Sequence, residues 1–318
     1  MRFALSRLLQ GIVVLLLVSL VAFLLLDLGP GDSVSGRIGG EIVDQAYIDQ
    51  LNEEYGLDKP ILVRYWKWLE HTMTGDLGNS TRTRQGINGE LKGRVPATLH
   101  ILVGAVIIGL LIGVPVGVLT AYRSNTWADN LLTIWATAGI SVPSFLLAVL
   151  AIFLFAVKLD WLPATGYVAI WTSPTDSVKG LVLPCAILGW EIGGILARHT
   201  RSSVLEVLRQ DYIRTARAKG LGTWIILWRH ALRNGLLPVV TVIGLLVGRL
   251  VSGVVVLETI FSVPGVGRYV VTAVANSDYT VVQAVVLLAA AAIVTANFLA
   301  DLAYAILDPR IRRQTGAR

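Results

Sequence analysis

Six runs of apolar residues constrain this chain most strongly. The first, 11–28, has no charged residue before Asp27, and five more follow at 98–122, 131–157, 181–199, 236–257 and 281–307. Each is close to or above the roughly 20 residues that an α-helix needs to cross about 30 Å of hydrocarbon. Charged residues make up only 15% of the chain, whereas soluble domains have roughly 25%. The sequence therefore predicts an all-α integral membrane protein with six transmembrane helices.

The segment 29–96, after the first run, is polar and too long for a simple helix connection. Its apolar and aromatic residues recur at helical spacing, first from Tyr47 to Leu57 and then from Ile61 to Leu69, which predicts two short amphipathic helices. The run before it is longer than the apolar region of a signal peptide and lacks a small-residue cleavage site, so we expect it to stay uncleaved.

We therefore divide the chain into four parts. They are the N-terminus with the first helix (1–28), an extracytoplasmic cap (29–96), a five-helix transmembrane core with a cytoplasmic loop at 200–234 (97–307), and a cytoplasmic tail (308–318).

The distribution of basic residues predicts the orientation in the membrane. Between Arg198 and Asn234 there are eight Lys or Arg against two acids, and the tail adds four arginines. Loops rich in Lys and Arg remain in the cytoplasm. We therefore expect the 200–234 loop and both termini to be cytoplasmic. This placement beside apolar runs explains the pI of about 9.6 better than nucleic-acid binding does.

The basic loop contains a pattern that charge alone does not explain. A short helical pattern starts at Asp211 and stops at Gly220, where a residue tolerant of positive φ can end one helix before another begins. Small residues would let another protein approach the backbone closely, and the cations would supply the edges of the contact. We expect a docking surface formed by Asp211, Tyr212, Arg214, Thr215, Ala216, Arg217, Ala218, Lys219, Gly220 and Leu221.

A simpler interpretation of the basic loop is that it has no docking role and only orients the protein in the membrane. The stretch 224–232 places Trp224, Leu227, Trp228, Ala231 and Leu232 on one face, and tryptophan favours the headgroup level. We expect this stretch to lie along the inner membrane surface and to anchor the docking helix.

The RTARAKGL stretch, followed by HALRNGLLP, resembles the cytoplasmic coupling loop of the membrane subunits of binding-protein-dependent ATP-binding-cassette importers. It is most similar to the peptide and nickel permease branch. The family signature reads Glu-Ala-Ala, three residues, then Gly, and Arg214 stands here in place of the Glu. YGLDKPILVRYWKWL, GDLGNS, the turn at Gly29–Asp32 and ETIFSVPGVGR also resemble that family. So does a closing motif at Asn297, Asp301, Tyr304, Asp308, Pro309 and Arg310, for which a structural anchoring role is expected.

The resemblance implies a permease subunit in the cytoplasmic (inner) membrane that moves peptides, nickel or a similar solute. Its implied partners are a similar second permease subunit, two ATP-binding-cassette ATPase domains, an extracytoplasmic solute-binding protein and membrane lipids. ATP and Mg²⁺ would be held by the ATPases, and no cofactor by this chain. The alternative class is a secondary transporter or channel that works without ATP, but inverted repeats, broken midplane helices and rings of pore charges are not evident.

Charged and small residues inside the apolar runs suggest further roles. Glu191 and Arg249 are costly in hydrocarbon, so we hypothesise that they pair or line the translocation path. Gly109, Gly113 and Gly117 recur every four residues, which we interpret as close helix packing rather than a pore. Proline at 115 and 143 predicts kinks.

Enzymatic readings find no support in the sequence. A Gly-x-Gly-Asp occurs at Gly29–Asp32, but no Tyr-Asp exists to supply a second protease carboxylate, and neither Gly-x-Ser-x-Gly nor His-Glu-x-x-His occurs. None of the six lysines precedes Ser or Thr, as a phosphate-binding loop requires. Four scattered histidines and a single cysteine, Cys185, predict no metal site. We predict no catalytic residues.

Overall fold

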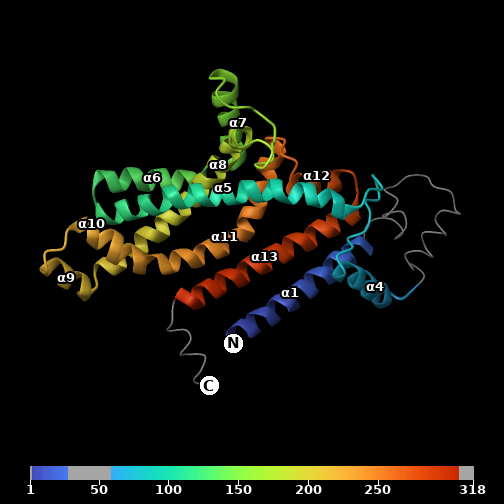
Figure 1. Ribbon diagram of the computed structural model, residues 1–318, viewed down its shortest axis with the longest axis horizontal. Helices are drawn as coiled ribbons and strands as arrows, with labels where there is room; N and C mark the ends of the chain where they lie inside the picture. The colour runs from blue at the N-terminus through green and yellow to red at the C-terminus, as the bar shows by residue number, and fades with distance from the viewer. Residues whose placement is uncertain (1, 28–58, 308–318) are drawn as a thin grey trace. The chain divides into compact units, whose positions relative to one another are not determined.

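The computed structural model describes residues 2–27 and 59–307, and the regular structure in these ranges is helical (Figure 1). The long helices are α1 (Arg2–Asp27), α5 (Ile87–Tyr122), α8 (Pro174–Leu208), α11 (Leu232–Ile260) and α13 (Tyr279–Leu307). The shorter ones are α4 (Ile61–Met73), α6 (Trp127–Ser141), α7 (Ser144–Ala151), η1 (Ile152–Lys158), α9 (Asp211–Ala218), α10 (Thr223–Ile225), η2 (Ile226–Ala231) and α12 (Val266–Ala275). The all-α prediction is confirmed.

Helices form two compact units. Within the described residues, the first comprises 3–27, 59–96 and 264–295, and the second comprises 97–263 and 296–307. The boundaries between these ranges fall inside α5 and α13. One part of each of these helices therefore belongs to the first unit and the rest belongs to the second. The predicted coupling loop and the residues predicted to line the path lie in the second unit.

In the first unit, α4 packs on α1 through aromatic side chains. The Phe23 ring lies 5.5 Å from Tyr65 and 5.7 Å from Trp68 between centroids, and the hydroxyls of Ser19 and Tyr65 share a hydrogen bond of 2.8 Å. These contacts use the face of α4 that carries Tyr65 and Trp68, whereas Trp66 is 67% exposed. The second amphipathic helix of the 29–96 segment is thus confirmed, and the first, at 47–57, lies outside the described residues.

The first unit also joins two distant loops. The carboxylate of Asp278 accepts hydrogen bonds from the hydroxyls of Ser80 and Thr81, and from the amide of Val281 in the first turn of α13. Asp278 is 4% exposed. One carboxylate therefore caps α13 and holds the turn that precedes α5.

In the second unit, α5 and α8 approach through glycine. A Cβ on Gly109, Gly113 or Gly117 would lie 2.5 Å from an atom of α8, and the atom opposing Gly113 is the carbonyl oxygen of Gly193. No side chain fits at such a separation. The predicted packing role of the three glycines is confirmed, because removing Cβ allows the two backbones to touch.

Pro143 breaks the third apolar run instead of only kinking it. Val142, before the proline, has an extended backbone with φ −79° and ψ 126°, as the proline ring requires of its neighbour. Helix α6 ends at Ser141, α7 begins at Ser144, and the two helices are bent by 100°. The run predicted as one kinked span at 131–157 is therefore a helix pair with a sharp bend.

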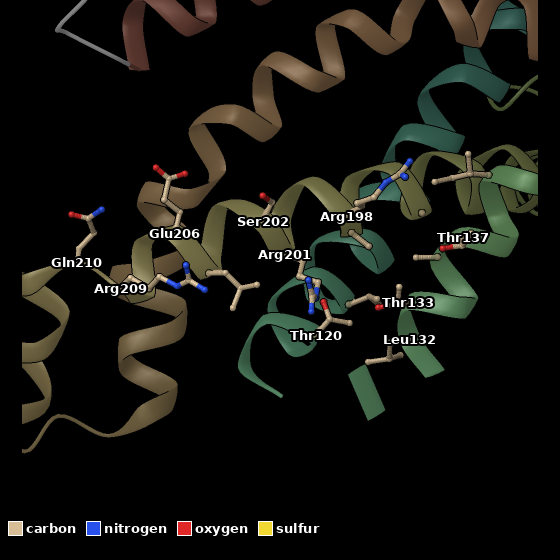
Figure 2. Close-up of a pocket in the computed structure, with 16 residues that line it drawn as sticks. Thr120, Leu132, Thr133, Thr137, Arg198, Arg201, Ser202, Glu206, Arg209 and Gln210 are labelled. Atoms are coloured by element: carbon tan, nitrogen blue, oxygen red, sulfur yellow. The ribbon is translucent and has the colours of Figure 1, made fainter. Parts of the chain in front are cut away.

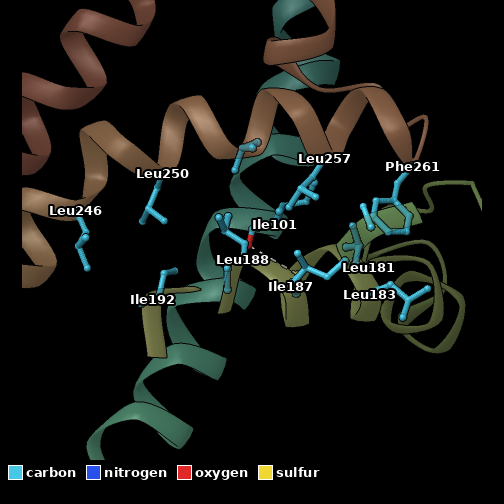
Figure 3. Close-up of a cluster of buried hydrophobic side chains, with 14 of the residues drawn as sticks. Ile101, Leu181, Leu183, Ile187, Leu188, Ile192, Leu246, Leu250, Leu257 and Phe261 are labelled. Carbon is cyan, nitrogen blue, oxygen red and sulfur yellow. Dashed lines mark hydrogen bonds between the residues drawn. The ribbon is translucent and has the colours of Figure 1, made fainter. Parts of the chain in front are cut away.

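The core of the second unit lies where α5, α8 and α11 meet (Figure 3). It contains Ile101 from α5, Leu188 and Ile192 from α8, and Leu250 and Leu257 from α11, all at most 5% exposed. One carboxylate joins this core: Glu258, at the end of α11, is fully buried and accepts a hydrogen bond from the Thr98 hydroxyl. Helix α8 thus packs against α5 on one side and against α11 on the other.

Within the described residues, α1, α5, α8 and α13 are long and apolar enough to cross a membrane, and the bent α6–α7 pair is a fifth candidate. In α11, residues Leu250–Ile260 form an apolar stretch shorter than a span. The sequence prediction of a multi-pass membrane protein therefore holds, and the count of six spans stays a prediction.

Candidate functional site

Helix α9 occupies the segment predicted to dock a partner. It runs from Asp211 to Ala218, with an acidic residue in its first turn and Arg217 in its last. This order of charges suits the helix dipole. The Thr215 hydroxyl donates to the Asp211 carbonyl at 3.1 Å. An isolated helix of eight residues is marginal in water, so α9 depends on its end cap and on contacts with the rest of the chain.

Gly220 closes α9 in a Schellman motif. Its φ is +79°, and its amide donates to the Arg217 carbonyl at 2.9 Å. The next amide, of Leu221, donates to the Ala216 carbonyl at 3.2 Å. These two bonds satisfy carbonyls that a helix end otherwise leaves open. The predicted helix end at Gly220 is thus confirmed by its backbone.

One face of α9 packs against its own chain. Ile213 is fully buried and Ala216 is 8% exposed, and both contact Ile226 of η2. Ala216 is therefore small because it fits this internal contact, a reason that the sequence reasoning did not consider. The remaining predicted docking residues are exposed, namely Asp211, Tyr212, Arg214, Thr215, Arg217, Ala218, Lys219, Gly220 and Leu221.

The exposed face of α9 is cationic and only weakly neutralised. Arg214 lies 3.5 Å from Asp211, but the two side chains are 78% and 95% exposed, and such pairs contribute little energy. The Asn234 side-chain amide donates to the Tyr212 hydroxyl at 2.8 Å and so links α9 to α11. The result is a braced helix that presents positive charge and a small side chain, Ala218, to solvent.

The stretch after Gly220 differs from its predicted amphipathic face. Leu227, Ala231 and Leu232 are buried against α5 and α8, whereas Trp224 and Trp228 are 57% and 43% exposed. The predicted face therefore divides between internal packing and exposed tryptophans. The membrane-surface position of the tryptophans stays a prediction.

The two residues predicted to line the path lie on different helices. Glu191 is half-buried on α8. Arg249 belongs to α11, and its side chain lies outside the described part of the structure. Their pairing stays a prediction.

The closing motif is described only in part. On α13, Asn297 is exposed and Asp301 is half-buried. The backbone of Tyr304 is helical, and its side chain lies beyond what the structure describes. Asp308, Pro309 and Arg310 also lie outside the described residues. The anchoring role of the motif therefore stays a prediction.

A cavity of about 730 Å³ that the sequence did not predict lies between α5, α6 and α8 (Figure 2). Beside it, Arg201 of α8 donates two hydrogen bonds to the Asp129 carboxylate of α6, at 2.7 and 3.0 Å. The Asp129 side chain is 4% exposed and that of Arg201 is 34% exposed. A Thr-x-x-Asp pattern at Thr126–Asp129 marks the start of α6 in the sequence, but nothing there identifies the arginine partner.

Long apolar helices packed against α8, with the braced basic helix α9 between α8 and α11 in the chain, define a polytopic membrane protein. The chain belongs to the family described as "Binding-protein-dependent transport system inner membrane component", which matches residues 113–313. The N-terminal part of that family's membrane components matches residues 1–102. The protein is therefore a permease subunit of an ABC importer, and an inner-membrane multi-pass protein.

Relatives of known name agree over nearly the whole chain. The dipeptide transport system permease protein DppB of Alkalihalophilus pseudofirmus is 40% identical over 330 residues, covering 98% of this chain and 99% of its own. A Brucella ovis protein named as a peptide permease is 39% identical over 316 residues, with 98% and 99% coverage. A Sinorhizobium fredii protein named as a peptide ABC transporter permease is 38% identical over 310 residues, with the same coverage. The predicted peptide-permease branch is thereby confirmed.

Proposed function

We propose that this subunit carries peptides or a similar small solute across the cytoplasmic membrane, driven by ATP that partner subunits hydrolyse. A solute-binding protein would deliver the solute outside, and a second permease subunit would complete the pathway. This chain would hold no nucleotide. The names of the relatives, which refer to peptides and dipeptides, support the choice of solute.

The observation that carries the proposal is the bracing of α9. Its inner face is buried through Ile213 and Ala216, its end is closed by Gly220, and Tyr212 is hydrogen-bonded to the start of α11. A force applied to its outer face would therefore pass to α8 and α11 rather than bend the loop. A loop that served only to orient the protein would need none of these contacts.

The assignment of sides follows from the same proposal. Residues 200–234 and both termini would face the cytoplasm, and the segment 29–96 would form the cap outside, with the core at 97–307 and the tail at 308–318.

Glu191 and Arg249 are proposed to pair or to line the path, because a charged side chain in hydrocarbon requires a partner or water. Asn297, Asp301, Tyr304, Asp308 and Arg310 are proposed to anchor the last helix.

A bulky substitution on the exposed side of α9 tests the docking role. Ala218 is exposed, so Ala218→Trp should leave insertion and folding intact while lowering the amount of ATPase retained by the purified permease and abolishing uptake. Ala216 is a poorer probe. Its side chain is buried, so a bulky residue at this position would disturb folding as well as docking.

Ala275→Trp provides the matched control. Ala275 is exposed on α12, on the predicted outer side, and this variant should retain the ATPase like the wild type. Retention and uptake at wild-type levels in Ala218→Trp would refute the docking assignment.

A further inference from the structure

The cavity between α5, α6 and α8 changes character along its length (Figure 2). On α8 its lining runs from Gly194 to Glu206, a distance of about 18 Å at 1.5 Å per residue, and it continues to Arg209 and Gln210 just past the end of the helix. One end is apolar, with Ala136 and Ile140 opposite Gly194. The other end is polar and contains arginines. A cavity of this length and polarity matches an amphiphile rather than a small soluble ion.

The lining of the cavity carries more positive than negative charge. Arg209 lines the polar end, and Arg198 lines the cavity one turn from Gly194 (Figure 2); neither has an ion-pair partner in the described part of the chain. Arg201 is balanced by Asp129, at 2.7 Å. Glu206 is the only acid in the lining formed by described residues, and its carboxylate points away from the Arg201 guanidinium (Figure 2). An anionic group is therefore favoured here.

Hydroxyl groups surround the same end. Thr120 of α5, Thr133 of α6 and Ser202 of α8 line the cavity, and Thr120 and Thr133 lie beside the Arg201 side chain (Figure 2). The Thr120 and Thr133 hydroxyls already donate to the Gly117 carbonyl and the Asp129 carboxylate, so the donors that suit the oxygens of a phosphate here are the Ser202 hydroxyl and the guanidinium groups.

The position along the helices is consistent with a lipid. Trp127, two residues before the Asp129 that binds Arg201, is 76% exposed. Tryptophan favours the headgroup level of a bilayer, which puts the cationic end of the cavity at that depth. The apolar end then lies beside the helices that cross the hydrocarbon, where acyl chains are available.

We propose that this cavity binds an anionic phospholipid. The phosphate contacts Arg209 and Ser202, and an acyl chain lies along Ala136, Ile140 and Gly194. Basic pockets between transmembrane helices on the cytoplasmic side are suited to such headgroups. The bound lipid fills the space between α6 and α8 next to the end of α8 that leads into α9. This inference goes beyond the transport function and requires only that α5, α6 and α8 lie in a membrane.

The test reconstitutes the whole transporter in nanodiscs of phosphatidylcholine with a minor share of phosphatidylglycerol. After extraction, the lipid that stays bound is identified by native mass spectrometry. The wild type should retain phosphatidylglycerol in preference to phosphatidylcholine, and Arg209→Gln should lower that preference about fivefold. Thr137→Trp, which fills the cavity from an exposed position, should lower retention of the lipid as well.

Arg233→Gln is the control, since Arg233 is an exposed arginine that does not line the cavity, and its lipid retention should equal that of the wild type. Equal retention in the wild type, Arg209→Gln and Thr137→Trp would overturn the proposal. So would competition by inorganic phosphate alone, which would make the cavity a site for a soluble anion. A high-yield cross-link from Ser202→Cys to the second permease subunit would also overturn it, by assigning this wall to a subunit interface.

Discussion

Replacing Gly220 by alanine isolates the energy of the cap that ends α9. The φ of Gly220 is +79°, and a Cβ there would meet nothing within 4 Å. The cost is therefore conformational and amounts to about 1–2 kcal/mol. Opening of the helix end should become about 5–30 times more frequent. The amides of Gly220 and Leu221, which donate to α9 carbonyls at 2.9 and 3.2 Å, report that opening directly.

The assay is hydrogen–deuterium exchange of the intact transporter, followed on a peptide that covers residues 211–225. Gly220→Ala should speed exchange there by the stated factor, and Gly220→Asn by less, because asparagine tolerates this conformation. Gly222→Ala is the matched control, since Gly222 has φ −61° and ψ 146° and equally open surroundings. Exchange in Gly220→Ala at the wild-type rate, or in Gly222→Ala at the faster one, would refute the reasoning.

Three further substitutions test the packing of the chain. Gly113→Leu should lower the melting temperature or prevent assembly, because a Cβ there would lie 2.5 Å from the α8 backbone, whereas Gly93→Leu, with nothing within 4 Å, should match the wild type. Arg201→Gln should destabilise the protein by about 1.5–3 kcal/mol, because it removes the charged hydrogen bonds to buried Asp129, which keeps only those from the Asn125 amide and the Thr133 hydroxyl; adding Asp129→Asn should recover most of the loss in thermal unfolding. Asp278→Ala should cost about 1 kcal/mol as a lost helix cap and speed amide exchange in residues 80–83; unchanged exchange would contradict the bridge to that turn.

Local features of the site could be predicted because they depend on neighbouring residues alone. The end of α9 needs only a short helical pattern followed by a glycine at positive φ, and both are visible in the sequence. Likewise, the spacing of Gly109 and Gly113 indicates a close helix contact whatever the partner helix is. The amphipathic helix α4 could be predicted in the same way, from the helical spacing of its apolar residues.

Features that depend on distant residues could not be predicted. The sequence does not show that Ile226 packs on Ala216 and buries its side chain. The Arg201–Asp129 pair joins residues 72 positions apart, and no local pattern connects them. Pro143 indicates a break, but the 100° bend between α6 and α7 also depends on how each helix packs.

Cross-linking of α9 to the ATPase tests the central claim most directly. The native thiol, Cys185, is buried, so Ala218→Cys adds an accessible one, and Ala275→Cys on α12 serves as the negative control. With the assembled transporter, the proposed docking predicts a cross-link from position 218 to the ATPase that changes in yield between nucleotide-free and nucleotide-bound states. No cross-link from position 218 in either state, with the ATPase present and active, would contradict it.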